Sequence, residues 1–178
     1  MPVELIKVVT KDQCAAVSKL AREIWMEHYT PLIGAEQVAY MLDKFQSADK
    51  IYADISNGYV YYAACDGGAF VGYMGLCPDD KGIFISKFYV RKEVRGKGIG
   101  KMFFKQAQIE SRRLIPRNPV HQTIEAPCFW LTVNKNNNSV EAYKKLGFEI
   151  SGELVTDIGS GFVMDDYVMT CPIRTYKN

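Results

Sequence analysis

The sequence has no apolar run long enough to span a membrane, and residues 1–4 do not begin a secretory signal. The net charge is only +2 over 178 residues, which is too small to favour nucleic-acid binding. Internal repeats, low-complexity tracts and linkers are also missing. These absences predict a cytoplasmic protein that binds neither a membrane nor nucleic acid, folded as a single domain over residues 1–178.

Cysteine is present, but not in a pattern that predicts a disulfide framework or a metal site. The cysteines are odd in number, and none forms a C-x-x-C pair: Cys14, Cys65, Cys77, Cys128 and Cys171. We expect most of them to be buried as small apolar side chains, and we expect no metal. With 48% hydrophobic and 24% charged residues, the composition is that of a folded domain.

The most informative stretch is residues 88–103, where an apolar strand leads into a basic, glycine-rich turn and then a helix. Three alternate glycines, Gly96, Gly98 and Gly100, let a ligand approach the backbone closely. The helix that follows begins with unpaired N–H groups and a positive dipole end, which favour an anion such as phosphate. The loop also carries the positive charges of Arg95, Lys97 and Lys101.

Two nucleotide-binding patterns fail on this loop. The dinucleotide pattern G-x-G-x-x-G requires a different glycine spacing. The Walker pattern fits Gly100 and Lys101, but it requires glycine where Arg95 stands and serine or threonine where Met102 stands. A glycine-rich hairpin turn with an accidental cluster of charges is the structural alternative.

The periodicity predicts a mixed order of helices and strands. Strands are expected over residues 4–9, 59–65, 69–77, 83–90, 128–133, 148–157 and 162–170. Helices are expected after the capping box at residues 10–13, through Val38 and Phe45, after Ser47, and over residues 99–114 and 140–146. Residues 115–127, with three prolines, read as an irregular connection. The fold class is therefore α+β.

A third loop pattern, R-x-x-G-x-G, is met by Arg95, Gly98 and Gly100. It resembles the pyrophosphate loop of the GNAT N-acetyltransferases, which bind acetyl-CoA. Residues 131–134 and 138–148, which include Asn134, Tyr143 and the pair Gly147-Phe148, resemble the second segment of that family. The resemblance implies a central, mostly antiparallel sheet of about seven strands flanked by helices.

The resemblance also implies roles in binding and using acetyl-CoA. The backbone of Phe88, Tyr89 and Val90 would pair with the pantetheine arm as an added strand, and a backbone N–H near Phe88 would polarise the thioester. Asn134 and Asn138 would hydrogen-bond the arm, and Tyr143 would protonate the leaving thiolate. The pyrophosphate would lie on the loop residues Arg95, Gly96, Lys97, Gly98, Ile99, Gly100 and Lys101. A core aromatic is the alternative for Tyr143, and turn formation is preferred for Asn136 and Asn137.

The attacking amine must lose a proton, yet residues 83–88 contain no carboxylate, although many family members place a glutamate there. The candidate bases are Glu27 and His28, or a base that acts through ordered water. His28 also continues the apolar stripe of its helix, so a structural role competes with a catalytic one.

Two further stretches resemble the bacterial PaiA-type polyamine N-acetyltransferases. The first comprises residues 25–34 with 40–42 and 45–47, and the second comprises residues 157–169. The implied acceptor is a small amine such as spermidine or spermine, held by carboxylates and aromatic faces. The candidate acceptor-binding residues are Trp25, Glu27, Tyr29, Asp165 and Asp166. Strand alternation lets only one of the two aspartates face the site. The alternative to an acceptor-binding role is that the acidic residues are solvated at the surface and the aromatic residues belong to the core.

Other functions compete with this one. The enzyme could acetylate a protein N-terminus, an amino sugar or an antibiotic, and the chain could instead be a regulatory module that binds acyl-CoA without turnover. Family resemblance suggests a homodimer.

Overall fold

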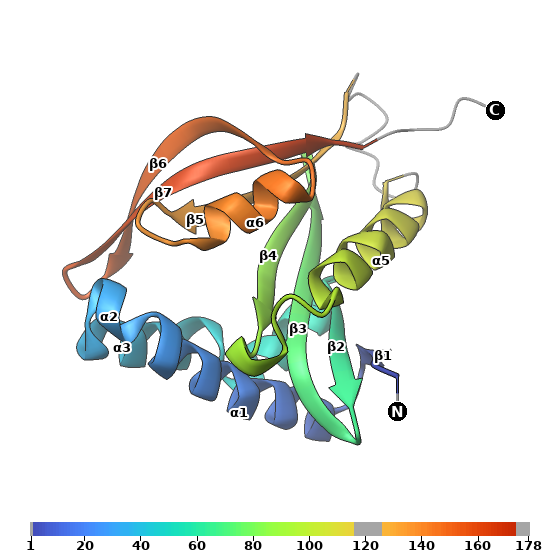
Figure 1. Ribbon diagram of the computed structural model, residues 1–178. Coiled ribbons are helices and arrows are strands. Elements are labelled where there is room, and N and C mark those ends of the chain that lie inside the picture. The colour runs from blue at the N-terminus through green and yellow to red at the C-terminus, as the bar shows by residue number, and fades with distance from the viewer. Residues whose placement is uncertain (1, 116–125, 174–178) are drawn as a thin grey trace. The chain divides into compact units, whose positions relative to one another are not determined.

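The computed structural model in Figure 1 describes residues 2–115 and 126–173. The strands are β1 (Glu4–Val8), β2 (Val60–Asp66), β3 (Ala69–Asp79), β4 (Gly82–Val90), β5 (Cys128–Asn134), β6 (Glu149–Gly159) and β7 (Phe162–Pro172). The helices are α1 (Lys11–His28), α2 (Thr30–Ile33), α3 (Ala35–Phe45), α4 (Ala48–Ser56), the 3-10 turn η1 (Lys92–Val94), α5 (Ile99–Leu114) and α6 (Ser139–Lys145). Of the expected connection at 115–127, residues 116–125 lie outside the described residues.

The strands form one seven-stranded mixed sheet in the order β1-β2-β3-β4-β5-β7-β6. Neighbours β1 and β2, β2 and β3, β5 and β7, and β6 and β7 pair antiparallel. Within the described residues, β4 and β5 pair in parallel. The predicted α+β architecture, a mostly antiparallel sheet flanked by helices, is confirmed.

Local signals explain where the helices begin. The Thr10 hydroxyl accepts a hydrogen bond from the Gln13 backbone N–H at 3.2 Å, and the Gln13 side chain accepts one from the Thr10 N–H at 3.0 Å. This is the predicted capping box. Ser47 caps α4 by accepting a hydrogen bond from the Lys50 N–H. The helix through Trp25 ends at His28, but Pro31 then lies inside the single turn α2, which the sequence did not predict.

The chain forms two compact units. The first contains Met1–Leu76 and Lys87–Phe103, and the second contains Cys77–Ser86 and Phe104–Asn178. In the first unit, α1 contacts α2, α3 and α4, and its buried face includes Val17, Leu20 and Ile24.

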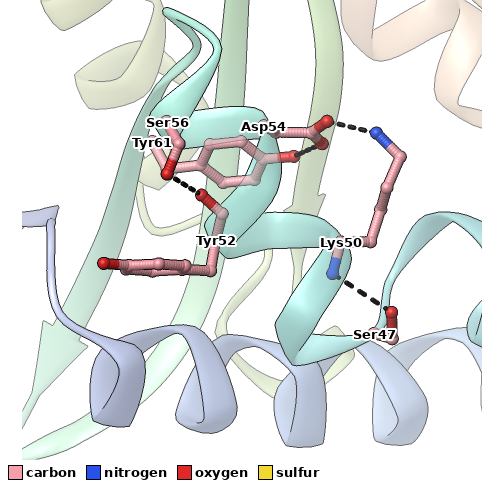
Figure 2. Close-up of polar contacts among 6 residues, drawn as sticks. All are labelled: Ser47, Lys50, Tyr52, Asp54, Ser56 and Tyr61. Atoms are coloured by element: carbon pink, nitrogen blue, oxygen red, sulfur yellow. Dashed lines mark hydrogen bonds and ion pairs between the residues drawn. The ribbon is translucent and has the colours of Figure 1, made fainter.

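A buried carboxylate ties α4 to β2 within the first unit (Figure 2). Asp54 is 5% exposed, and its Oδ2 accepts a hydrogen bond from the Tyr61 hydroxyl at 3.0 Å. Its Oδ1 pairs with the Lys50 ammonium one helical turn earlier. Both oxygens are therefore satisfied, as the burial of a charged group requires.

In the second unit, the ladder between β5 and β7 sorts the side chains onto two faces. Leu131 and Met169 are opposite one another and buried on the face that also carries Phe129. This face packs against α5, because the rings of Phe104 and Phe129 lie 5.2 Å apart. The pairs Thr132–Val168 and Asn134–Asp166 lie on the other face, because side chains alternate along a strand. Figure 1 shows β6 and β7 as a long curved hairpin beside β5.

No helix in the described part of the chain has the length and apolar character needed to cross a membrane.

Candidate functional site

The glycine-rich loop after β4 has an open surface in the structure. Gly96 and Gly98 have φ values of 78° and 86°, a region that side chains other than glycine rarely adopt. No atom lies within 4 Å of where a Cβ would stand at either glycine. Helix α5 begins at Ile99, and the Met102 N–H already donates to the Gly98 carbonyl, so the N–H groups of residues 99–101 are those without a partner within the helix. The loop therefore offers backbone donors to an anion.

Three cations surround these donors, Arg95, Lys97 and Lys101, and all are exposed. The Arg95 Nε donates a hydrogen bond to the Val90 carbonyl at 3.1 Å, which holds its side chain against the end of β4. None of the three forms an ion pair with an acid among the described residues. Their charge is available to a ligand, and donors of this kind suit a diphosphate.

Close packing fixes the end of β4 that leads into the loop. The Phe88 ring packs on Phe103 of α5 at 5.7 Å between centroids, and a Cβ on Gly100 would lie 3.6 Å from the Phe88 ring. On β3, a Cβ at Gly72 would come within 2.8 Å of the Tyr89 carbonyl and 3.2 Å of the Phe103 ring. Gly72 therefore permits this packing, and a glycine inside a strand is the sequence signal of such a close approach.

The predicted acceptor-binding aromatics form a buried cluster in the first unit. Trp25 stacks on Tyr29 at 4.4 Å and contacts Tyr89 at 5.5 Å. Trp25 is 3% exposed and Tyr29 is 8% exposed, so both side chains are largely covered within the chain. Their role toward a ligand stays a prediction.

Glu27 and His28, the predicted bases, end α1. Glu27 is exposed, and its carboxylate lies 3.9 Å from the Lys92 ammonium in η1. The His28 ring packs edge-on against Tyr29 at 4.9 Å. The structure thus places Glu27 in a surface ion pair and His28 beside the aromatic cluster.

Lys87, next to Phe88 on β4, was not singled out from the sequence. It is half-buried, and burial lowers the pKa of its ammonium to about 8, although the charge of Asp54 opposes this shift. The nearby Lys50 ammonium adds to the lowering of the pKa. The sequence signal that could have identified it is a charged residue in the mostly apolar stretch of residues 83–90.

The asparagine-rich segment belongs to the second unit. Asn134 ends β5, and its Oδ1 accepts a hydrogen bond from the Asn136 N–H at 3.0 Å. Asn137 is buried and accepts one from the Ser139 N–H, which agrees with a role in the turn. Asn138 precedes α6 without capping it through its side chain. Tyr143 is half-buried, with its ring 6.1 Å from Phe148.

The two neighbouring aspartates of β7 have opposite environments. Asp165 has a side chain 56% exposed and pairs with Lys135 at 2.7 Å, as Glu153 also does. Asp166 is only 7% exposed, and burial raises the pKa of its carboxyl to about 6. Of the two, Asp166 is therefore the residue that turns inward.

Comparison with known proteins decides the family. Residues 29–164 match the acetyltransferase (GNAT) domain family, which is more than half of the chain. The chain belongs to the GNAT acetyltransferases. This GNAT protein is 27% identical over 120 residues to an uncharacterized N-acetyltransferase encoded in the pepI 3′ region of Lactobacillus delbrueckii subsp. lactis. That alignment covers 62% of this chain and 68% of the relative.

Solved structures show that the GNAT fold extends over nearly the whole chain. The PaiA N-acetyltransferase of Thermoplasma acidophilum, solved with coenzyme A, has a TM-score of 0.72 at 18% identity, covering 97% of this chain and 99% of that one. An aminoglycoside 6′-acetyltransferase type Ii has a TM-score of 0.64 at 19% identity, covering 98% and 99%. At such identities the likeness establishes the fold alone.

As a GNAT N-acetyltransferase, the protein uses acetyl-CoA to acetylate an amine. The loop fits that co-substrate, because its open glycines, the N–H groups at the start of α5, and cations that form no ion pair within the described residues suit a diphosphate. The described residues contain no group of three or more histidine, cysteine, aspartate or glutamate side chains that would hold a metal ion.

Proposed function

We propose that this GNAT enzyme transfers acetyl from acetyl-CoA to a primary amine of a polyamine, such as spermidine or spermine, by direct attack on the thioester. The observation that supports acetyl-CoA as the acetyl donor is the loop of Gly96 and Gly98, which is open to solvent and is followed by the first N–H groups of α5.

The chain's own residues supply the binding and the proton transfers. The loop amides, with Arg95, Lys97 and Lys101, bind the diphosphate, and the backbone of Phe88, Tyr89 and Val90 pairs with the pantetheine arm. In the second unit, Asn134 and Asn138 hydrogen-bond that arm, and Tyr143 donates a proton to the departing thiolate.

Two features support a polyamine as the acceptor. Asp166 supplies a buried carboxylate, and an ammonium group is the natural partner of such an anion. The sequence resemblance of residues 25–34 and 157–169 to the PaiA-type polyamine N-acetyltransferases also points to this acceptor. A homodimer, which the family resemblance suggests, and the cytoplasmic location expected from the sequence belong to the same proposal.

The acceptor is tested by measuring CoA release from acetyl-CoA with spermidine, spermine, putrescine, a lysine peptide, glucosamine and an aminoglycoside. We expect the highest kcat/KM with spermidine or spermine. A clear preference for another amine would still support acetyl-CoA as the acetyl donor, but it would rule out a polyamine as the acceptor. Binding of acetyl-CoA without turnover on any amine would instead favour a regulatory module.

Substitution of Tyr143 tests the proton donor. We expect Tyr143→Phe to lower kcat by about 10²- to 10⁴-fold, because a positioned acid contributes that much, with little change in acetyl-CoA affinity. Tyr52→Phe, which removes the hydroxyl of an exposed tyrosine on α4, is the matched control and keeps the wild-type rate. Unchanged turnover by Tyr143→Phe would leave Tyr143 a core aromatic.

A further inference from the structure

Asp166 faces the same side of the sheet as Asn134, the residue proposed to bind the pantetheine arm. The two are opposite one another in the antiparallel pairing of β5 and β7. Side chains of such a pair project from the same face, with Cβ atoms about 5 Å apart. The carboxyl of Asp166 therefore lies beside the Asn134 side chain, which is proposed to bind the pantetheine arm of acetyl-CoA.

The Asp166 carboxyl is buried but not fully hydrogen-bonded. The Thr132 side chain donates a hydrogen bond to it, whereas its Oδ1 is inaccessible to solvent and has no partner among the described residues. Native proteins rarely leave a buried polar atom unpaired, because its lost hydration is not recovered. Since Asp166 Oδ1 has no partner among the described residues, we expect its hydrogen-bond donor to belong to the bound substrate.

The other acids proposed for the acceptor site are already engaged. Asp165 pairs with Lys135, which also binds Glu153. Glu27 is exposed and lies beside Lys92. Among these acids, Asp166 is the one that is buried and has a carboxylate oxygen with no hydrogen-bond partner among the described residues.

We infer that Asp166 is the general base of the transfer, binding the acceptor's ammonium group at Oδ1 and taking its proton before attack. This rests on the proposed function, and it makes Asp166 the base in place of Glu27 or His28.

The protons and bonds balance with the groups named. The ammonium gives one proton to the Asp166 carboxylate, and the neutral nitrogen attacks the thioester carbonyl. The C–N bond forms as the C–S bond breaks, the nitrogen gives its second proton to water, and the thiolate takes a proton from Tyr143. Tyr143 then takes a proton back from water, and Asp166 releases its proton to water, so the products are the N-acetyl amine, CoA and one proton.

The charge environment suits a base that works near neutral pH. Burial raises the pKa of Asp166 to about 6, the Thr132 hydrogen bond opposes this rise, and the negative charge of Asp165 adds to it. The flanking positions of β5 and β6, Asn134 and Leu154, bring no further charge. A carboxyl with such a pKa is ionised at pH 7 and is more basic than a solvated aspartate.

The first test compares Asp166→Asn with wild type in the CoA-release assay between pH 5 and 9. We expect kcat/KM of the wild type to fall below about pH 6, and Asp166→Asn to lose this dependence along with about 10²- to 10³-fold in kcat. Acetyl-CoA affinity should change less than about twofold, because the amide keeps the shape of the carboxyl. Glu149→Gln removes an exposed carboxylate from the neighbouring strand β6 and should retain the wild-type rate and profile.

A variant with the wild-type rate and pH profile would overturn the role of Asp166 and leave the proposed function intact. Wild-type protein that binds acetyl-CoA but acetylates no primary amine would overturn the proposed function, and the role of Asp166 with it.

A second test needs no variant. In wild-type protein saturated with CoA, which cannot transfer acetyl, the carboxyl carbon of Asp166 is titrated by NMR with and without spermidine. We expect spermidine to lower the pKa of Asp166, because a bound ammonium favours the carboxylate. An unmoved pKa at saturating spermidine would overturn the inference.

Discussion

At the scale of single residues, the environment set by distant parts of the chain decides what a charged side chain does. Asp54 and Asp166 are both buried aspartates, yet Asp54 has both oxygens engaged, whereas Asp166 has an oxygen with no partner in the described part of the chain. A satisfied carboxylate stabilises the fold, and an unsatisfied one is a candidate for chemistry.

Asp54 is therefore expected to be structural. Asp54→Ala removes the carboxylate that accepts a hydrogen bond from the buried Tyr61 hydroxyl and pairs with the half-buried Lys50 ammonium, which should cost about 2–3 kcal/mol in the free energy of unfolding. Urea denaturation measures the loss. Asp49→Ala, in the exposed first turn of the same helix, removes only a favourable dipole interaction and should cost about 0.5 kcal/mol. Equal losses of unfolding free energy in the two variants would show that the hydrogen bond and ion pair of Asp54 stabilise the fold no more than a surface charge does.

Lys87 is expected to destabilise the fold at neutral pH. Its folded-state pKa of about 8 lies below that of an unfolded lysine, so the native state disfavours the ammonium. The penalty is complete below pH 8 and disappears as the pH rises from 8 toward 10.5. Lys87→Met should raise the free energy of unfolding by about 1–2 kcal/mol at pH 7, after allowance for partial solvation, and by less at pH 10.

Denaturation of Lys87→Met and wild type at pH 7 and pH 10 checks this expectation. A gain in stability that is the same at both pH values would assign the effect to apolar packing and not to the buried charge.

At the scale of elements, the strand–loop–helix unit of β4 and α5 was predictable because its signals are local. Three glycines at alternate positions, a cluster of cations and an apolar run all lie within residues 88–103. Capping at Thr10 and Ser47 was predictable for the same reason. The turn α2 was missed because proline commonly ends a helix, yet it is also accepted in a first turn, where its missing N–H is not needed.

The loop should be sensitive to side chains for reasons of binding as well as backbone strain. Gly98 and Gly58 have φ values of 86° and 95°, and neither has an atom near a Cβ position. Replacement of either by alanine should cost about 1–2 kcal/mol, since both need a left-handed backbone. Only Gly98→Ala should also weaken acetyl-CoA binding, because only that Cβ stands in the anion loop.

Calorimetric titration with acetyl-CoA and thermal unfolding of both variants separate the two effects. Acetyl-CoA affinity that falls equally in Gly58→Ala and Gly98→Ala would trace the loss to general destabilisation and not to the loop.

At the scale of the whole molecule, acetyl-CoA binding should stabilise the fold. A ligand at 100 times its Kd adds about 2.7 kcal/mol when it binds only the native state. We expect acetyl-CoA and CoA to raise the Tm, and ATP to raise it much less, because ATP offers phosphates but no pantetheine arm for β4. Equal shifts with ATP and CoA in thermal unfolding would favour a nucleotide loop instead.

The sequence by itself determined the order of strands and helices, the anion loop and the family, because hydrophobic periodicity, caps and glycine motifs act over short stretches of chain. Only the tertiary structure decided that Asp166 turns inward while Asp165 pairs with Lys135, and that Lys87 lies near Asp54. Burial, register and pKa depend on pairing with residues distant in sequence. Strand alternation alone leaves open which of two adjacent aspartates is covered.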